Sequence, residues 1–247
     1  MKLTKSEIVK MAEISALDAD IRLEEFKRYG NVEPNKRNYD INKMKALWYN
    51  ANYFDIKNME GLYGELDGSL FITLRGTDSI LDWIRNFIFF KKIIPYEGTN
   101  PEIRVHAGFL KNYKIIRKFI HDIIKQYSNI NKIVIYGHSM GAVTGALMAL
   151  DIQYNFPNKE IGCFCIGMPR LGNDAFKKSF ERRLPDFIRC DYGEDIIPQL
   201  PPKCFGFSEL EKFIHFGPAR KRWIGKKSHH DWHLYLDAIK NELKEEF

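Results

Sequence analysis

The stretch that decides the fold covers residues 132–141 and reads Lys-Ile-Val-Ile-Tyr-Gly-His-Ser-Met-Gly. Its first half, residues 132–136, has the apolar, β-branched composition of a strand buried on both faces. Residues 141–154 are mostly small or aliphatic, which is typical of a buried helix. When a strand passes into a helix within a few residues, the turn between them is sharp, and Ser139 lies in this turn between two glycines. We therefore predict that the turn presents the Ser139 hydroxyl at the end of a buried strand.

Strand and helix patterns alternate along the rest of the chain. We expect helices at residues 6–29, 108–127, 174–183 and 232–244, and strands at 61–65, 69–74, 161–166 and 187–190. Asp67-Gly68 between two of these strands is a tight-hairpin signal. The alternation predicts an α/β fold with a mostly parallel central sheet and helices on both faces. Since there is no repeat or linker, residues 1–247 are expected to form a single domain, with an N-terminal helical region at 1–60.

Composition excludes several classes of protein. The chain has 247 residues, of which 45% are hydrophobic, and no stretch approaches the roughly 18 apolar residues of a membrane span. The four cysteines form no CxxC pair, which argues against zinc, and we interpret them as small buried hydrophobes. The net charge of +6 gives weak attraction to anionic interfaces, but no nucleic-acid recognition module is legible.

The beginning of the sequence lacks the apolar stretch of a signal peptide. This favours a cytoplasmic protein, or an extracellular one if the sequence is that of a processed form. The sequence makes no prediction about the oligomeric state.

A serine hydroxyl needs a base and a group that orients the base before it can act as a nucleophile. After a strand–serine–helix turn, the order along the chain is serine, then an acid, then histidine. Asp195 follows the strand at 187–190 and a glycine turn, so it is the preferred acid, with Asp191 and Glu194 as alternatives. Four histidines lie further on: His215, His229, His230 and His233.

The segment 228–233 opens the last helix, which favours a base at its start. His233 lies inside that helix and is expected to be packed or solvated. His106, His121 and His138 precede the acid, so we interpret each of them as structural. Ser139 itself would lie at a helix N-terminus, where free N–H groups stabilise negative charge, and the Met140 N–H is one expected oxyanion donor.

Several segments, taken together, resemble the class 3, fungal-type lipases of the α/β-hydrolase superfamily. The similar segments follow the family's order from about residue 71 to residue 235. They are Phe71-Ile-Thr-Leu-Arg-Gly-Thr-Asp-Ser-Ile-Leu-Asp-Trp83, Val105-His-Ala-Gly-Phe109, Gly137–Gly141, Gly167-Met-Pro-Arg-Leu-Gly-Asn173, Asp195-Ile-Ile-Pro with Leu200-Pro-Pro202, and His230-Asp-Trp-His-Leu-Tyr235. Six ordered segments are far more specific than any one of them.

The resemblance implies an α/β-hydrolase fold with Ser139, Asp195 and His230 as the catalytic triad. His230 is preferred over His229 because Tyr235 follows it by five positions, as in the family pattern, and His229 stays open as an alternative. The resemblance also gives Thr77 the second oxyanion-hole position, beside Met140. Neither a metal ion nor another cofactor is needed for this chemistry.

Residues 79–92 correspond to the family's lid, a short helix over the active site. Apolar side chains crowd this stretch, and Leu81, Trp83, Ile84 and Phe87 are the expected substrate-binding or lid residues. Such a helix would cover the groove in water and open during transient binding to a lipid interface. The alternative is that it packs on the core. Asn86 replaces the acidic residue that the family often has.

The sequence therefore predicts a serine hydrolase that cleaves carboxylic esters of lipids, similar to triacylglycerol lipases, by an acyl-enzyme mechanism. A short-chain carboxylesterase or phospholipase of the same fold is the first alternative. A non-catalytic binding protein is the second, and the full set of Ser, Asp and His argues against it.

Overall fold

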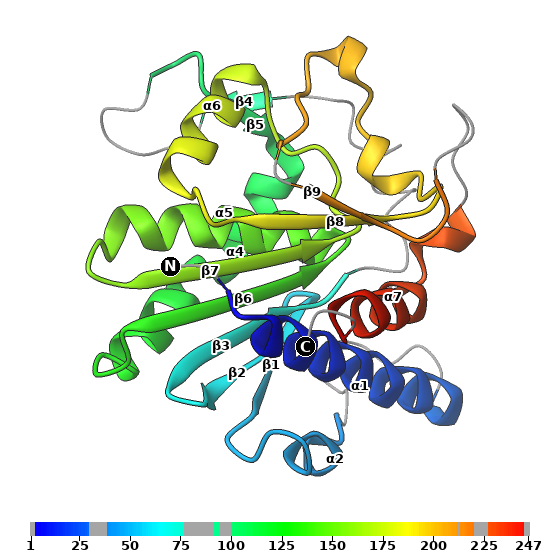
Figure 1. Ribbon diagram of the computed structural model, residues 1–247. Helices are drawn as coiled ribbons and strands as arrows, with labels where there is room; N and C mark the ends of the chain where they lie inside the picture. Colours follow the sequence, from blue (N-terminus) through cyan, green and yellow to red (C-terminus); the bar gives the residue numbers. More distant parts are fainter. Residues whose placement is uncertain are drawn as a thin grey trace.

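A seven-stranded sheet forms the centre of the molecule (Figure 1). The computed structural model describes residues 3–29, 39–76, 91–93, 100–211, 213–219 and 227–244. Within them, the strand order is β1-β2-β3-β6-β7-β8-β9, with β1 to β3 antiparallel and β3 to β9 parallel. The strands are β1 (Asn52–Ile56), β2 (Met59–Leu66), β3 (Ser69–Leu74), β6 (Lys132–His138), β7 (Glu160–Ile166), β8 (Ile188–Tyr192) and β9 (Phe213–Phe216). A separate ribbon pairs β4 (Lys91–Ile93) with β5 (Arg104–His106).

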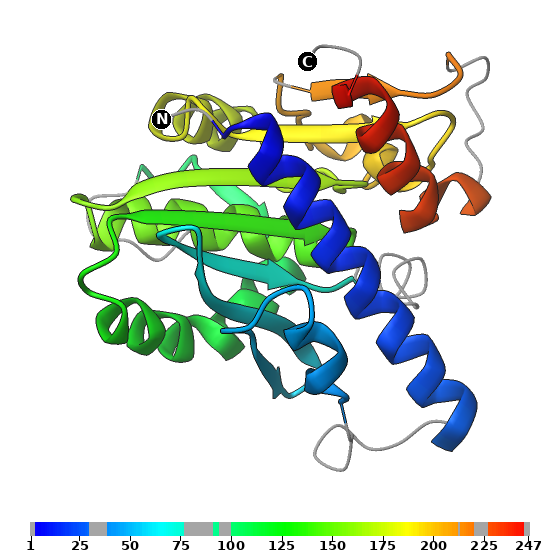
Figure 2. The ribbon, with the colours of Figure 1, turned by 60° about the horizontal axis from the view of Figure 1, so that its bottom comes forward.

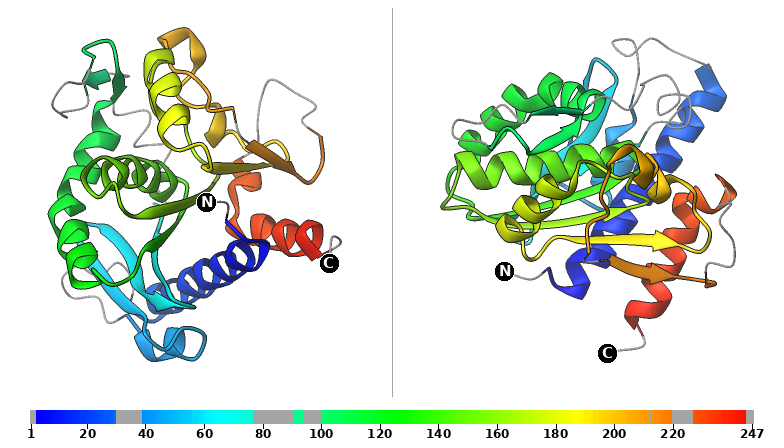
Figure 3. Two further views of the ribbon diagram at one scale, coloured as in Figure 1. Left: turned by 60° about the vertical axis from the view of Figure 1, so that its left-hand side comes forward. Right: turned by 90° about the horizontal axis from the view of Figure 1, so that it is seen from above.

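Helices cover both faces of the sheet. On one face lie α4 (Ala107–Gln126), α5 (Met140–Asn155) and α6 (Asp174–Arg183). On the other face α1 (Lys5–Tyr29) runs beside α7 (Trp232–Lys244), as Figures 2 and 3 show. The short helix α2 (Ile41–Lys45) and the 3-10 turns η2 (Ile197–Gln199), η3 (Lys203–Phe205) and η4 (Lys227–His230) complete the described elements.

The sheet separates two hydrophobic cores, and strand alternation explains the division. Successive side chains of a strand point to opposite faces of the sheet. In β6, Ile133 and Ile135 join the core under α4 and α5, whereas Val134 and Tyr136 join the core under α1 and α7. A strand that serves two cores has to be apolar at every position, which is the pattern of residues 133–136.

The structure confirms the α/β fold, the mostly parallel sheet and the helices on both faces. Asp67 (φ 49°) and Gly68 (φ 73°) form the expected hairpin turn between β2 and β3. The expected helical region at residues 1–60 was wrong at its end, because residues 52–56 form β1. This strand is short and has Asn and Asp, which are poor strand formers, so its pairing with β2 decides its structure.

Three further expectations have different outcomes. Cys163, Cys165 and Cys190 are buried as expected, but Cys204 is exposed. The lid expected at 79–92 lies outside the described residues except for Lys91 and Lys92, which belong to β4. Among the helices described, none is long and apolar enough to cross a membrane. That the chain forms one domain stays a prediction.

Candidate active site

Ser139 occupies the turn between β6 and α5, as the sequence predicts. Its backbone has φ 59° and ψ −121°, a conformation that non-glycine residues rarely adopt and that is found at functional sites. The Ser139 amide donates to the Ile166 carbonyl at 3.0 Å, which fixes the turn to β7. A Cβ atom on Gly141 would lie 2.2 Å from the Leu74 carbonyl oxygen, so the turn requires glycine there. The sharp turn follows from this close approach of β3 to α5.

Three side chains from distant parts of the chain meet at this turn. His230, in η4, has its Nε2 2.8 Å from Ser139 Oγ. Its other nitrogen, Nδ1, lies 2.7 Å from Oδ2 of Asp195, which follows β8. With the proton on Nδ1, the imidazole donates to the carboxylate and accepts from the serine hydroxyl. The structure therefore brings together the three residues expected from the sequence, in the expected order.

Further contacts hold the Asp195 carboxylate, which is fully buried. The Tyr235 hydroxyl donates to Asp195 Oδ2 at 2.7 Å, and the Ile197 amide donates to Oδ1 at 2.9 Å. Burial, together with the charges of Asp195 and Asp191, holds the pKa of Tyr235 well above its usual value, so this hydroxyl stays a donor. Sequence reasoning used Tyr235 only to choose between two histidines. Its spacing from His230 was the available signal for this contact.

The alternative acids and bases lie in other environments. Asp191 Oδ1 is 3.7 Å from the Arg189 guanidinium, with which it forms a buried ion pair. His229 Nδ1 accepts the backbone N–H of Glu194 at 2.9 Å, so this histidine holds the turn after β8. The acid and base therefore differ from their sequence neighbours in the direction of their side chains.

His215 and His233 are also separate from the site. His215 Nε2 lies 3.2 Å from the Pro218 carbonyl oxygen. His233 is exposed, and its Nε2 lies 3.9 Å from Asp20. His233 is solvated, as expected, and His215, one of the four histidines that follow the acid, makes its contact at Pro218.

The N-terminus of α5 places the backbone N–H group of Met140 beside Ser139. Met140 is the first residue of α5, and the first N–H groups of a helix lack partners within it. The end of β3 passes alongside, because a Cβ atom on Gly76 would lie 2.9 Å from Ser139 Cβ. The next residue, Thr77, lies outside the described residues, as do Leu81, Trp83, Ile84 and Phe87. Their oxyanion, substrate and lid roles stay predictions.

His138 packs directly against the candidate base, a contact that sequence reasoning missed. Its ring stacks on that of His230 with centroids 4.7 Å apart and planes 29° apart. Burial, with smaller contributions from His230 and the cation of Arg75, holds the pKa of His138 well below its usual value. His230 is therefore stacked on a neutral ring.

The remaining two histidines have structural roles, as expected. His106 Nδ1 accepts the N–H groups of Gly108 and Phe109 at 3.2 and 3.4 Å, so this side chain caps the N-terminus of α4. His121 contacts Asp151, far along α5 from Ser139. In the part of the chain that the structure describes, no three or more His, Cys, Asp or Glu side chains are grouped to hold a metal ion.

The arrangement has the parts that acyl transfer requires. An imidazole between a hydroxyl and a buried carboxylate can take the hydroxyl proton while the oxygen attacks a carbonyl carbon. The adjacent helix N-terminus stabilises the negative charge that develops on the carbonyl oxygen.

Comparisons with known proteins agree with this geometry. A family-wide sequence model described as lipase (class 3) matches residues 71–205, more than half of the chain. This chain belongs to the class 3 lipase family. The matched region includes Ser139 and Asp195 and ends before His230.

Individual members of the family are distant relatives. A lipase of Rhizomucor miehei is 32% identical over 173 residues, which are 67% of this chain and 44% of that protein. A lipase of Rhizopus niveus is 30% identical over 163 residues, 63% of this chain and 38% of that protein. The secreted mono- and diacylglycerol lipase LIP4 of Malassezia restricta is 27% identical over 203 residues, 79% of this chain and 65% of that protein. The chain thus spans 38% and 44% of the lengths of the Rhizopus and Rhizomucor lipases.

Solved structures of two lipases share the fold. The Rhizomucor miehei triacylglyceride lipase superposes with a TM-score of 0.69 at 20% identity, covering 93% of this chain and 95% of that one. A triacylglycerol lipase whose catalytic centre is described as a serine protease triad superposes with a TM-score of 0.65 at 23% identity, covering 88% and 83% of the two chains. The fold is therefore the α/β-hydrolase fold.

Proposed function

We propose that this class 3 lipase family member is a serine hydrolase that cleaves carboxylic ester bonds of lipids. One observation carries the proposal: the continuous hydrogen-bonded series from Ser139 Oγ through His230 to Asp195, at 2.8 and 2.7 Å. The strained backbone of Ser139 and its place at the N-terminus of α5 support the same role. In this proposal Ser139 is the nucleophile, His230 the general base and Asp195 the acid that orients it.

The reaction proceeds by two acyl transfers. His230 accepts the Ser139 proton as Oγ attacks the ester carbonyl carbon, and the N–H groups of Met140 and Thr77 hold the oxyanion. The tetrahedral intermediate collapses, the C–O bond to the alcohol breaks, and His230 returns the proton to that alcohol. Water then attacks the acyl-enzyme with the same base, which releases the carboxylic acid and restores Ser139.

The names of the relatives support glycerol esters of fatty acids as the substrate class, since they include a triacylglyceride lipase and a mono- and diacylglycerol lipase. In the proposal, the part of residues 79–92 that precedes β4 forms the lid, with Leu81, Trp83, Ile84 and Phe87 contacting the acyl chain or the lipid interface. Relatives named as secreted support the extracellular of the two locations considered. None of the relatives reported above supports the cytoplasmic one.

The test is hydrolysis of p-nitrophenyl esters from acetate to palmitate by wild type and Ser139→Ala. We expect Ser139→Ala to lower kcat by at least about 10⁴-fold, because the nucleophile is lost. His230→Ala is expected to have a similar effect. His229→Ala is the matched control and should keep most of the activity, because that side chain contacts a backbone amide outside the triad.

The chain-length profile separates the alternatives. An optimum at medium or long acyl chains supports a lipase, whereas a short-chain optimum assigns a general carboxylesterase with the same mechanism. Activity that survives in Ser139→Ala would overturn the nucleophile assignment. A folded wild type without activity on any ester would overturn the proposed hydrolase and favour a binding protein.

A further inference from the structure

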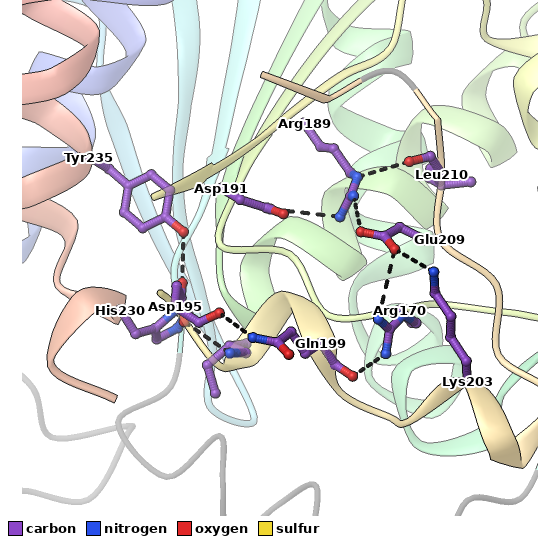
Figure 4. A network of polar contacts seen from close by, with 11 residues as sticks. Arg170, Arg189, Asp191, Asp195, Gln199, Lys203, Glu209, Leu210, His230 and Tyr235 are labelled. Carbon is purple, nitrogen blue, oxygen red and sulfur yellow. Dashed lines mark hydrogen bonds and ion pairs between the residues drawn. The ribbon is translucent and has the colours of Figure 1, made fainter. Parts of the chain in front are cut away.

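Arg170 binds three successive carbonyl groups of the segment that follows Asp195. Figure 4 shows its contacts with Gln199 and Glu209. It lies in the loop after β7, in the Gly167–Asn173 motif, and the proposed mechanism does not use it. The Arg170 amide donates to the Leu200 carbonyl at 2.7 Å, and its Nη1 donates to the Pro201 carbonyl at 2.9 Å. The same Nη1 also donates to the Gln199 carbonyl. One residue therefore fixes the backbone at positions 199, 200 and 201.

This segment leads directly back to the Asp195 carboxylate. The amide of Ile197, within it, donates to Asp195 Oδ1 at 2.9 Å. The Gln199 side chain donates to the Asp195 carbonyl at 3.4 Å, and the Gln199 amide donates to the Ile196 carbonyl at 3.0 Å. The segment is thus a compact turn, and fixing its far end restricts the acid at its near end.

A partly buried ionic cluster holds Arg170 itself. The Glu209 carboxylate forms ion pairs with Arg189 at 2.7 Å, Lys203 at 3.0 Å and Arg170 at 3.8 Å. Burial opposes its ionisation, but Lys203, Arg189 and Arg170 together hold the pKa of Glu209 below its usual value. Arg189 belongs to β8, the strand that leads into Asp195, and it also donates to the Leu210 carbonyl at 3.1 Å. Glu209 therefore connects Arg170 to the strand on the other side of the acid.

We propose that Arg170 is a positioning residue that fixes the Asp195 carboxylate against His230 Nδ1 through the 199–201 backbone. The inference rests on the proposed function and assigns a role to a motif that the triad leaves unexplained. The guanidinium binds two carbonyl groups through Nη1 while its Nη2 lies 3.8 Å from Glu209, and the single nitrogen of a lysine ammonium cannot occupy both positions. Misplacement of a catalytic group by about 1 Å can cost roughly 10²-fold in rate.

The first test is a double-mutant cycle with Arg170→Lys and Asp195→Asn, assayed on a p-nitrophenyl ester. We expect Arg170→Lys to lower kcat by about 10- to 100-fold, with KM changed by less than about twofold. In the Asp195→Asn background the same substitution should cost less than about threefold. The reason is that the position of residue 195 no longer matters once it cannot orient the imidazole. Equal losses in both backgrounds would mean a merely structural role and would overturn the inference.

Two further variants guard against general destabilisation. Arg117→Lys is the matched control, because Arg117 makes a comparable ion pair with Asp151 at 3.1 Å, away from Ser139. It should leave kcat unchanged. Glu209→Gln removes the charge that holds Arg170 but keeps the shape, so it should lower kcat less than Arg170→Lys does, again only when Asp195 is present. An Arg117→Lys variant that loses as much kcat as Arg170→Lys would contradict a specific role for Arg170.

A second readout does not depend on turnover. The proton between His230 Nδ1 and Asp195 gives a downfield ¹H NMR resonance, assigned by its absence in His230→Ala. We expect Arg170→Lys to shift or broaden this resonance, while Arg117→Lys leaves it in place. An unchanged resonance in folded Arg170→Lys overturns the positioning role whether or not the protein hydrolyses esters. Absence of Ser139-dependent hydrolysis in wild type would overturn the proposed function alone.

Discussion

Two fully buried carboxylates, Asp195 and Asp151, have nearly the same partners and different environments. Asp195 accepts from the Tyr235 hydroxyl at 2.7 Å and contacts His230 at 2.7 Å. Asp151 accepts from the Tyr113 hydroxyl at 2.6 Å and contacts His121 at 2.5 Å. A search for a buried aspartate bonded to a histidine and a tyrosine would find both sites.

The difference lies in what surrounds each pair. Asp151 also receives a permanent cation, Arg117 at 3.1 Å, and the Asn155 amide at 3.0 Å. Within the described residues, His230 is the only basic group paired with Asp195, and no hydroxyl or thiol is bonded to His121. A carboxylate already neutralised by arginine has less to gain from a charged histidine. We infer that the Asp151 cluster joins α4 to α5, while Asp195 keeps its charge for a transient imidazolium.

Replacing each of the two aspartates by asparagine tests this comparison. One of the two replacements should have the largest effect that we expect. Asp195→Asn should lower kcat by about 10⁴-fold with little loss of stability, because the amide still accepts hydrogen bonds but no longer selects the imidazole tautomer. Asp151→Asn should leave kcat of the folded protein intact and lower the free energy of unfolding by about 1 to 2 kcal/mol, since the hydrogen bonds at this buried position no longer have a charged acceptor. Ester hydrolysis and urea unfolding of both variants measure the two effects.

If the two variants changed activity and stability in the same way, the two aspartates would not differ in role. In particular, an Asp151→Asn protein that is stable but inactive would assign the α4–α5 cluster a role in catalysis. Enzyme concentration has to be corrected for the folded fraction of each variant, because a loss of stability raises the share of unfolded protein.

The next largest effect is expected from filling the space beside the His230 ring. Gly167 has φ +57°, and a Cβ atom there would lie 2.8 Å from His230 Cε1 and 3.3 Å from Asp195 Oδ2. Gly167→Ala should therefore displace the imidazole and lower kcat by about 10- to 100-fold. Gly145→Ala, within α5, is the control, because its Cβ would meet only the Ile135 and Leu74 side chains at 3.2 and 3.8 Å. Equal kcat in the two variants would show that the site tolerates movement of His230.

The sequence predicts the candidate site better than it predicts its surroundings. Ser139 is marked by a local pattern, because the strand, turn and helix are adjacent in the chain. Asp195 and His230 follow from chain order and from motif spacing. Local sequence did not exclude Asp191 and Glu194 as the acid or His229 as the base. These residues lie within a few positions of Asp195 or His230. The direction of a side chain after a strand end depends on the turn, here at Gly193 with φ 48°.

Other contacts depend on packing between distant elements and leave no local signal. His121 and Asp151 are 30 residues apart on two helices that meet only in the folded protein. Likewise, β1 forms because it pairs with β2, although its own composition is poor for a strand. The ionic cluster around Glu209 joins a loop, a strand and a 3-10 turn, so no single stretch of sequence predicts it.

The rings beside the two histidines sharpen the comparison further. His121 meets the edge of Phe156, with centroids 5.0 Å apart and planes 79° apart. His230 instead stacks on another titratable ring, His138. A phenylalanine at 138 would keep the aromatic stack and remove the titration.

The expected effect of His138→Phe is the smallest and concerns the pH dependence of stability. Burial and neighbouring positive charge hold the pKa of folded His138 well below 6.5, so above that pH the ring is neutral in both the folded and unfolded states. Below about pH 6.5 only the unfolded chain binds the proton, and each pH unit removes about 1 kcal/mol of stability until the folded pKa is reached. The variant lacks this loss. Its free energy of unfolding, measured in urea at pH 7.5, 6 and 5, should therefore gain on that of wild type by about 1 kcal/mol between pH 6 and 5. If the free energies of unfolding of variant and wild type differed by the same amount at all three pH values, His138 would titrate alike in the folded and unfolded protein. His230 would then be stacked on a ring that can itself become protonated.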